Sequence, residues 1–314
     1  MSGFSPERSA LRGIGSSAVV VAHTATLITV LGIVAVPDSG KILAGLSELG
    51  WVGVALFLTL SIYLLMGSLD EKPDLRRYFK RRIVRIWPLY FATCIAIFVL
   101  ADRNLEHLAW NVTFLAPINP AQSFALNWSW STRGVWWTLE VEELAYLCFP
   151  LIRILCHRNR VAAGWGLIAI GAALMVSPLN SPLNEPLFYV TPWPWLVCYG
   201  FGLLAYERAL PGLAQWGPWA ILLVPVALGV PALRWPLGLI LIGPVIAWVI
   251  AYPPKWLRRK TLVAVGESSY ALYLTHGFWL EYLGPAGAMA AYPFAWCAEY
   301  LQRGRQMSRR VRQT

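Results

Sequence analysis

Charged side chains are scarce in this sequence. Only 13% of its 314 residues are Asp, Glu, Lys or Arg, whereas soluble domains carry about a quarter. Apolar residues make up 57% of the chain, and the mean hydropathy is +0.54. A water-soluble globular fold is therefore excluded for most of the chain, and a lipid bilayer is the expected solvent.

Cysteines in ligand-like patterns are also missing. The five cysteines stand inside or at the ends of apolar runs, without the spacing of a metal site or of a disulfide framework. We interpret them as small core residues. The sequence thus predicts no metal site and no permanently bound cofactor.

Long apolar runs recur from end to end, and about 20 such residues suffice for a helix to cross a bilayer core. The 17 tryptophans suit this reading, because indole rings settle at membrane interfaces. The pattern predicts an all-α integral membrane protein, a bundle of about ten transmembrane helices. The predicted spans cover residues 13–36, 49–66, 86–101, 134–156, 161–177, 191–207, 214–231, 235–252, 262–281 and 283–300.

The basic residues fix an orientation. If ten spans place both termini in the cytosol, only four of the 26 Lys and Arg residues lie on the extracytoplasmic side of the membrane, namely Lys41, Arg103, Arg133 and Arg234. This asymmetry follows the positive-inside rule, so membrane topology explains the net charge of +10 better than a nucleic-acid partner does. We expect one transmembrane domain over residues 1–300 and a basic cytosolic tail over residues 301–314.

A few ionisable residues stand inside predicted spans, where a charge costs ~2.5–3.5 kcal/mol on insertion scales. They are His23, the adjacent pair Glu142 and Glu143, and His276. At about 1.5 Å of rise per residue, His23 and Glu142 lie within about one helical turn of the same depth, and His276 lies toward the outer half. We therefore predict that these groups line one cavity.

Three arginines stand at the predicted cytosolic mouth. Arg12 precedes His23 by eleven residues, so at about 100° per residue both share one helix face. Arg82 and Arg85 are three apart and also share a face. Guanidinium groups bind phosphate bidentately, so a long anionic ligand could place its phosphates on arginine and its reactive end at His23.

Simpler interpretations stand beside these. A lone intramembrane histidine can simply hydrogen-bond a neighbouring helix, and the Arg82–Arg85 pair can mark topology only. Glu142 and Glu143 point about 100° apart, so one of them can be structural. The outer stretch 102–133, rich in tryptophan, either stacks a sugar or only anchors the chain at the interface.

Five motifs follow one another over most of the chain, namely Arg12–His23, Gly50–Ser61, Arg82–Tyr90, Trp137–Tyr146 with Pro150, and Gly266–His276. In this order and at these spacings they resemble the acyltransferase 3 family of bacterial membrane O-acyltransferases. There are departures: Ile62 replaces a usual glycine, Ala145 a usual aromatic residue, and only 38 residues follow His276, which predicts a short or altered last span.

The resemblance implies transfer of an acyl group from cytosolic acyl-CoA to a hydroxyl of an extracytoplasmic glycan or lipid-linked oligosaccharide, as in exopolysaccharide modification. The expected acyl group is acetyl, with acetyl-CoA as the donor. It also implies a multi-pass protein of the bacterial cytoplasmic (inner) membrane, in contact with membrane lipids and no nucleic acid. The expected site comprises catalytic His23, Glu142 and His276, donor-binding Arg12, Arg82 and Arg85, and supporting Trp137, Tyr146 and Tyr270.

In this hypothesis His23 acts as general base on the acceptor hydroxyl or briefly carries the acyl group, and the sequence leaves both open. Glu142 would orient an imidazole, of either His23 or His276. The rival is a proton-coupled transporter or flippase of a polysaccharide-assembly system, in which His23 and Glu142 relay protons. Against it, the two halves show no internal repeat. A third alternative is a structural scaffold.

Overall fold

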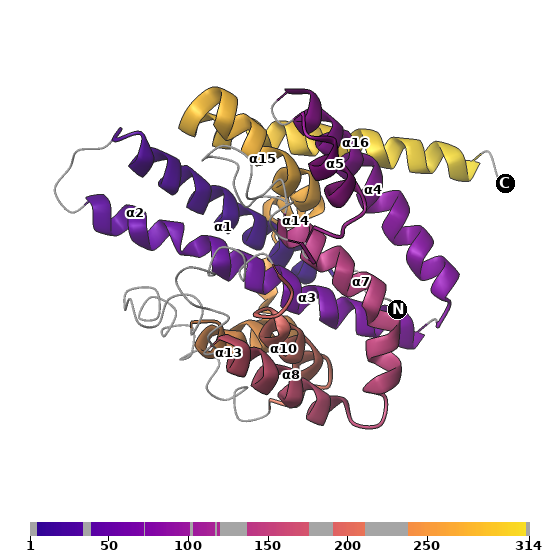
Figure 1. Cartoon of the computed structure of the whole chain (residues 1–314). Helices are drawn as coiled ribbons and strands as arrows, with labels where there is room; N and C mark the ends of the chain where they lie inside the picture. The colour runs from indigo at the N-terminus through magenta and orange to yellow at the C-terminus, as the bar shows by residue number, and fades with distance from the viewer. Residues whose placement is uncertain are drawn as a thin grey trace. The chain divides into compact units, whose positions relative to one another are not determined.

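The computed structural model describes residues 5–33, 39–71, 73–100, 103–116, 118–119, 137–175, 191–210 and 238–311 (Figure 1). In these ranges the regular elements are helices, as the all-α prediction requires. They are α1 (Pro6–Val30), α2 (Ser39–Ser47), α3 (Leu49–Glu71), α4 (Leu75–Leu100), α5 (Leu105–Val112), α7 (Trp137–Leu155), α8 (Arg160–Met175), α10 (Leu196–Tyr206), α13 (Gly238–Ala251), η4 (Lys255–Arg258), α14 (Lys260–Glu267), α15 (Ser269–Leu283), η5 (Gly284–Ala286) and α16 (Gly287–Val311).

Every predicted span overlaps one of these helices except 214–231, which lies outside the described residues. Among the described helices, Pro6–Val30, Ile42–Glu71 and Leu75–Leu100 are long and apolar enough to cross a membrane on their own. Shorter apolar helices are α8, α10 and α13. In its described residues the protein is thus all-helical, with three helices that could cross a membrane, while the count of ten and the cytosolic termini remain predictions.

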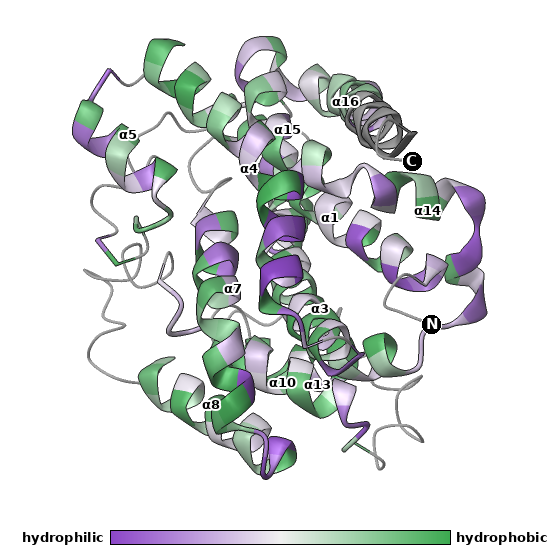
Figure 2. Cartoon of the chain, turned by 90° about the vertical axis from the view of Figure 1, so that its right-hand side faces the viewer, coloured by the Kyte–Doolittle hydropathy of each residue, from purple (hydrophilic) through white to green (hydrophobic). Residues whose placement is uncertain are grey.

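Several predicted boundaries are wrong. Helix α4 begins eleven residues before the start of the predicted span at residue 86. The basic segment 75–85, predicted to be a loop, is therefore helical. Asp74 explains this start, because its carboxylate accepts the backbone N–H of Arg77 at 3.0 Å and caps the first turn. Lys and Arg are also good helix formers. Figure 2 shows the result, hydrophilic turns in the first half of α4 and hydrophobic turns in the second.

The last two predicted spans also differ. Residues 262–281 form two helices, α14 and α15, with Ser268 between them. The final helix is not short, because α16 runs for 25 residues and continues through residue 300 into the predicted tail. The first span ends early, at Val30, where Gly32 adopts a positive φ of 61° that an L side chain rarely takes.

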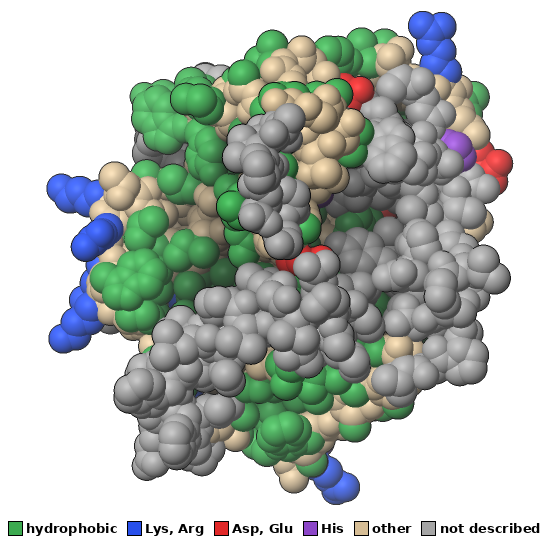
Figure 3. Space-filling view, turned by 90° about the vertical axis from the view of Figure 1, so that its left-hand side faces the viewer, with side chains coloured by type: hydrophobic (Ala, Val, Ile, Leu, Met, Phe, Trp, Pro, Cys, Tyr) green, Lys and Arg blue, Asp and Glu red, His purple; other side chains and the backbone are tan. Residues whose placement is uncertain are grey.

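Among the described residues in view in Figure 3, apolar side chains form large patches on the surface. On α4, for example, Ile95, Val99 and Leu100 are each more than half exposed. Large exposed apolar areas are costly in water. They fit helices that face lipid.

The chain divides into two compact units, and the division falls inside α3. We call residues 54–254 the central unit, and residues 5–53 with 255–314 the terminal unit. In the central unit, α10 packs on α8 and α13 (Figure 1). The α8–α10 contact is close, since a methyl group at Gly164 would lie 3.0 Å from the Leu204 side chain and 3.1 Å from the Gly200 carbonyl oxygen. Small residues that let helix backbones approach are typical of membrane helix pairs.

One carboxylate joins four helices of the central unit. Asp70 of α3 accepts hydrogen bonds from Arg153 of α7 at 3.0 Å, from Arg160 of α8 at 2.6 and 3.0 Å, and from Tyr206 of α10 at 3.0 Å. Arg160 also pairs with Glu207 at 3.1 Å. These side chains are less than one third exposed, so solvent screens the network only partly.

In the terminal unit, α1 packs against α2, α14 and α15, and α15 packs against α16. Helix α1 starts at an N-cap, because the Ser5 hydroxyl accepts the backbone N–H of Arg8 and Pro6 occupies the first turn. Glu7 pairs with Arg258 of η4. These contacts fix the helices that carry the two predicted histidines.

Candidate active site

The two histidines predicted to be catalytic meet inside the terminal unit. His23 of α1 and His276 of α15 approach through Nδ1 of His23 and Nε2 of His276, 2.9 Å apart. The ring centres lie 5.1 Å apart and the ring planes differ by 12°. The nitrogens are much closer than the ring centres, so the rings meet edge to edge in nearly one plane. That is the geometry of a hydrogen bond between imidazoles.

The surroundings of the two rings differ. His276 is fully buried, whereas His23 is half-buried. Nδ1–H of His276 donates to the carbonyl oxygen of Tyr273 at 2.7 Å, with the Leu272 carbonyl at 3.2 Å. His276 is therefore held by its own helix, and His23 is the ring with an accessible edge.

Glycines bring α1 close to the helices that follow it in the terminal unit. A methyl group on Gly13 of α1 would lie 2.7 Å from the backbone nitrogen of Gly266 of α14. A methyl group on Gly266 would overlap the Ser9 carbonyl. Farther along, the Tyr292 hydroxyl of α16 donates to Ser17 of α1 at 2.9 Å. The register of α1, and hence the position of His23, depends on these contacts.

A second cluster of predicted residues lies in the central unit. Glu142 of α7 accepts hydrogen bonds from the hydroxyls of Ser61 and Tyr146. The Arg82 guanidinium of α4 lies over the Tyr146 ring, 4.4 Å from its centre, and 5.8 Å from the centre of the Tyr78 ring. The Tyr78 hydroxyl donates to the Tyr146 carbonyl oxygen at 3.0 Å. Tyr146 thus contacts both the cation and the carboxylate.

Arg82 is suited to bind an anion. It is half-buried, its contacts are with aromatic faces, and it forms no ion pair with any residue in the described part of the chain. A guanidinium has five N–H donors, and stacking on rings leaves its edge available. Arg85, also half-buried, follows three residues later on α4, and Arg12 is half-buried on α1.

Trp137 and Tyr270 are the other two predicted supporting residues. Trp137 is buried in the central unit, with its ring centre 5.2 Å from that of Trp195. Tyr270 is half-buried on α15. The structure thus groups His23 with His276, and Arg82 with Glu142 and Tyr146. The predicted orientation of an imidazole by Glu142 remains a prediction.

Two other carboxylates of α7 are more buried than Glu142. Glu140, which the sequence analysis did not single out, accepts the Tyr90 hydroxyl at 2.9 Å. Trp87 donates to Glu143 at 3.4 Å, and the other carboxylate oxygen of Glu143 is buried with no hydrogen-bond partner among the described residues. Glu140 and Glu143 are three residues apart and face α4 together. That spacing was the available signal, since helix positions i and i+3 share a face.

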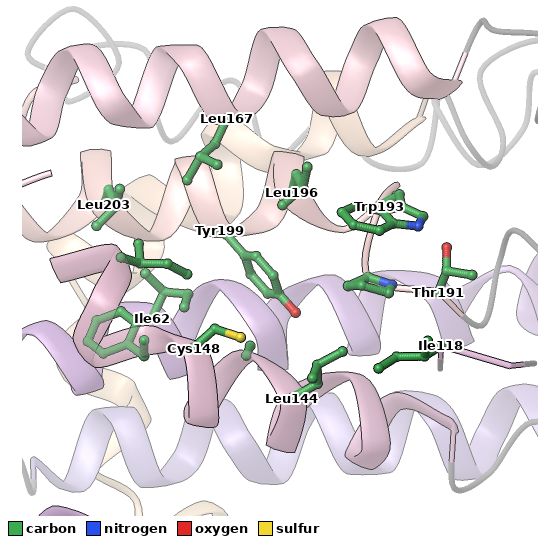
Figure 4. Close-up of a pocket in the computed structure, with 14 residues that line it drawn as sticks. Ile62, Ile118, Leu144, Cys148, Leu167, Thr191, Trp193, Leu196, Tyr199 and Leu203 are labelled. Carbon is green, nitrogen blue, oxygen red and sulfur yellow. The ribbon is translucent and has the colours of Figure 1, made fainter. Parts of the chain in front are cut away.

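A cavity of about 450 Å³ opens in the central unit (Figure 4). Leu144 and Cys148 of α7, Ile62 of α3, Tyr199 of α10 and Trp193 contribute to its wall. The lining is almost entirely apolar, so the cavity suits a hydrocarbon or aromatic group. In the described ranges, no group of three or more His, Cys, Asp and Glu side chains is placed to hold a metal ion.

Comparisons with known proteins identify the family of this chain. Residues 9–298 match the acyltransferase domain family. A protein of Acidianus two-tailed virus named "putative acetyltransferase ORF330" is 30% identical over 99% of this chain and 94% of its own length. Acyltransferase MdmB of Streptomyces mycarofaciens is 26% identical over 77% of this chain and 71% of its own. Nodulation protein 10 of Rhizobium leguminosarum bv. viciae is 24% identical over 78% and 79%.

No solved structure matches the chain. The family match covers most of the sequence and includes the segments on which the resemblance rested. It confirms the prediction of an enzyme over a transporter or a scaffold. The chain belongs to the acyltransferase 3 family, and it is an acyltransferase.

Proposed function

We propose that the protein transfers an acyl group, acetyl in the simplest case, from cytosolic acyl-CoA to a hydroxyl group of an extracytoplasmic or lipid-linked glycan. Family membership supports acyl transfer, and a relative named as an acetyltransferase supports acetyl. The glycan acceptor follows from the resemblance alone. A multi-pass location in a bacterial cytoplasmic membrane belongs to the same proposal.

The observation that carries the proposal is the hydrogen bond between His23 and His276. A half-buried imidazole whose other nitrogen is held by a buried partner is oriented for proton transfer. The pairing joins positions 253 residues apart, and both were singled out from the sequence.

In the proposed reaction the His23 imidazole accepts the proton of the acceptor hydroxyl while that oxygen attacks the thioester carbonyl carbon. The carbon–sulfur bond breaks, and the CoA thiolate leaves. The proton on His23 then passes to the sulfur, so the imidazole returns to its neutral form. The products are the acyl ester and free CoA.

Arginines are proposed to hold the donor. Arg82 supports this role best, because its guanidinium rests on two tyrosine rings and keeps N–H donors for a phosphate. Arg12 and Arg85 are the other proposed phosphate ligands. Glu142, Ser61 and Tyr146 would keep Arg82 in place, since Tyr146 contacts both Arg82 and Glu142.

The test uses the full chain in lipid vesicles with radiolabelled acetyl-CoA and a neutral polysaccharide panel as acceptors. We expect label in an alkali-labile ester on at least one polysaccharide with the native protein, and at least about a 100-fold loss with His23→Ala, as for removal of a general base. His157→Ala is the matched control, because His157 is exposed beyond the end of α7. A folded His23→Ala protein with full transfer would exclude His23 as the base, and label on no acceptor would reject the glycan.

A further inference from the structure

We infer that His276 is a positioning residue that fixes the tautomer of His23, so that Nε2 of His23 is the nitrogen that accepts the proton. The inference rests on the proposed function for its kinetic consequence only. Its structural content, which nitrogen carries hydrogen, is open to a separate measurement.

The hydrogen bond from His276 to its own helix has only one possible direction. Carbonyl oxygens accept hydrogen bonds and cannot donate. Nδ1 of His276 lies 2.7 Å from the Tyr273 carbonyl oxygen and 3.2 Å from that of Leu272. The hydrogen must therefore sit on Nδ1 of His276.

The surroundings of the two rings determine the charge of His276. Neither ring forms an ion pair with a carboxylate in the described residues of the terminal unit. His276 is fully buried, and an unpaired charge in an apolar environment is strongly disfavoured. His276 is therefore neutral. With its hydrogen on Nδ1, its Nε2 carries a lone pair and accepts.

The tautomer of His276 in turn determines the tautomer of His23. Nε2 of His276 and Nδ1 of His23 are 2.9 Å apart, so Nδ1 of His23 must supply the hydrogen. In the neutral ring that leaves the lone pair on Nε2, at the far side of the ring from His276. The backbone carbonyl of Tyr273 thus determines the reactive nitrogen of His23 through one intervening imidazole.

The arrangement also stabilises the charge that forms during reaction. When Nε2 of His23 takes a proton, the ring becomes a cation with its Nδ1–H still directed at the lone pair of His276. Hydrogen bonds with a charged donor are about twice as strong as neutral ones. His276 therefore stabilises the protonated form of His23 more than the neutral form, which is what a general base requires of its partner.

The tautomer is tested by solid-state NMR on the full chain, labelled with nitrogen-15 histidine and placed in lipid bilayers. Signals of His23 are those lost in His23→Ala. We expect a protonated Nδ1 and an unprotonated Nε2 for His23 in the native protein. In His276→Leu we expect both tautomers of His23 to be populated. Protonation on Nε2 in the native protein would overturn the inference, as would an unaltered His23 signal in His276→Leu.

Kinetics separate positioning from simple packing. His276→Gln keeps a carbonyl oxygen that can accept from Nδ1–H of His23, whereas His276→Leu does not. We expect kcat to fall by about 10- to 100-fold in His276→Leu with the KM for acetyl-CoA unchanged, and Gln to restore much of it. Equal losses in both variants would point to packing and contradict positioning. If no acetyl transfer occurs in any variant while the native tautomer is as stated, the proposed function fails and the positioning of His23 stands.

Discussion

Substitution of Gly266 by Ala tests how α1 and α14 set the position of His23. A methyl group at this position overlaps the carbonyl group of Ser9, which is backbone and cannot rotate away as a side chain would. The two helices must therefore separate. Forcing extra atoms into a packed contact costs about 1–3 kcal/mol, offset by about 0.5–1 kcal/mol because Ala favours helix over Gly. We expect a net loss of stability, together with weaker acetyl transfer because the His23–His276 bond is stretched.

Gly45→Ala is the matched control in the same unit. Gly45 lies in α2 and has no atom within 4 Å of the position a methyl group would take. The same change there should leave stability equal or raise it by about 0.5–1 kcal/mol. Thermal unfolding of both purified variants in one detergent provides the comparison. A Gly266→Ala protein that unfolds at or above the temperature of Gly45→Ala would show that the α1–α14 contact tolerates the methyl group.

Two further predictions concern the central unit. Arg82→Met keeps the apolar stem of the side chain but removes its charge. The KM for acetyl-CoA should therefore rise by about 10- to 100-fold, the equivalent of about 1.5–3 kcal/mol for a charge-assisted hydrogen bond, with a smaller change in kcat. An unchanged KM would exclude a donor-binding role. Asp70→Asn removes the charge that accepts from Arg153, Arg160 and Tyr206 and should lower stability by about 1–3 kcal/mol; thermal unfolding indistinguishable from the native protein would contradict this.

Much of the helix layout could be predicted because apolar runs reveal membrane helices directly. The helix boundaries could not. The basic segment 75–85 at the start of α4 was predicted to be a loop because of its charge. It is helical because Asp74 caps its first turn and the long basic side chains can extend to the membrane interface. The break at Ser268 falls inside a continuous apolar pattern, and composition carries no signal for it.

The histidine pair was predictable in part. The helix rise placed His23 level with Glu142 and His276 toward the outer half, and all three were predicted to line one cavity. The structure brings the rings of His23 and His276 into contact. Which nitrogen meets which depends on side-chain rotation and on the Tyr273 carbonyl, which no sequence pattern encodes. Asp70 was missed for a related reason: it is recognisable only once the guanidinium and hydroxyl groups that contact it are known. Glu140 was missed although its spacing from Glu143 places both on one helix face.

The Arg82 guanidinium lies over the ring of Tyr146, and the Tyr146 hydroxyl donates a hydrogen bond to the Glu142 carboxylate. A positive charge over the ring withdraws electron density from the phenol and makes its O–H a stronger donor toward Glu142. An anion that drew the guanidinium away from the ring would weaken that bond. Anion binding at Arg82 and the strength of the Tyr146–Glu142 hydrogen bond are therefore coupled, and the coupling is reciprocal: the free energy by which a bound anion weakens the hydrogen bond equals the free energy by which the hydrogen bond opposes anion binding.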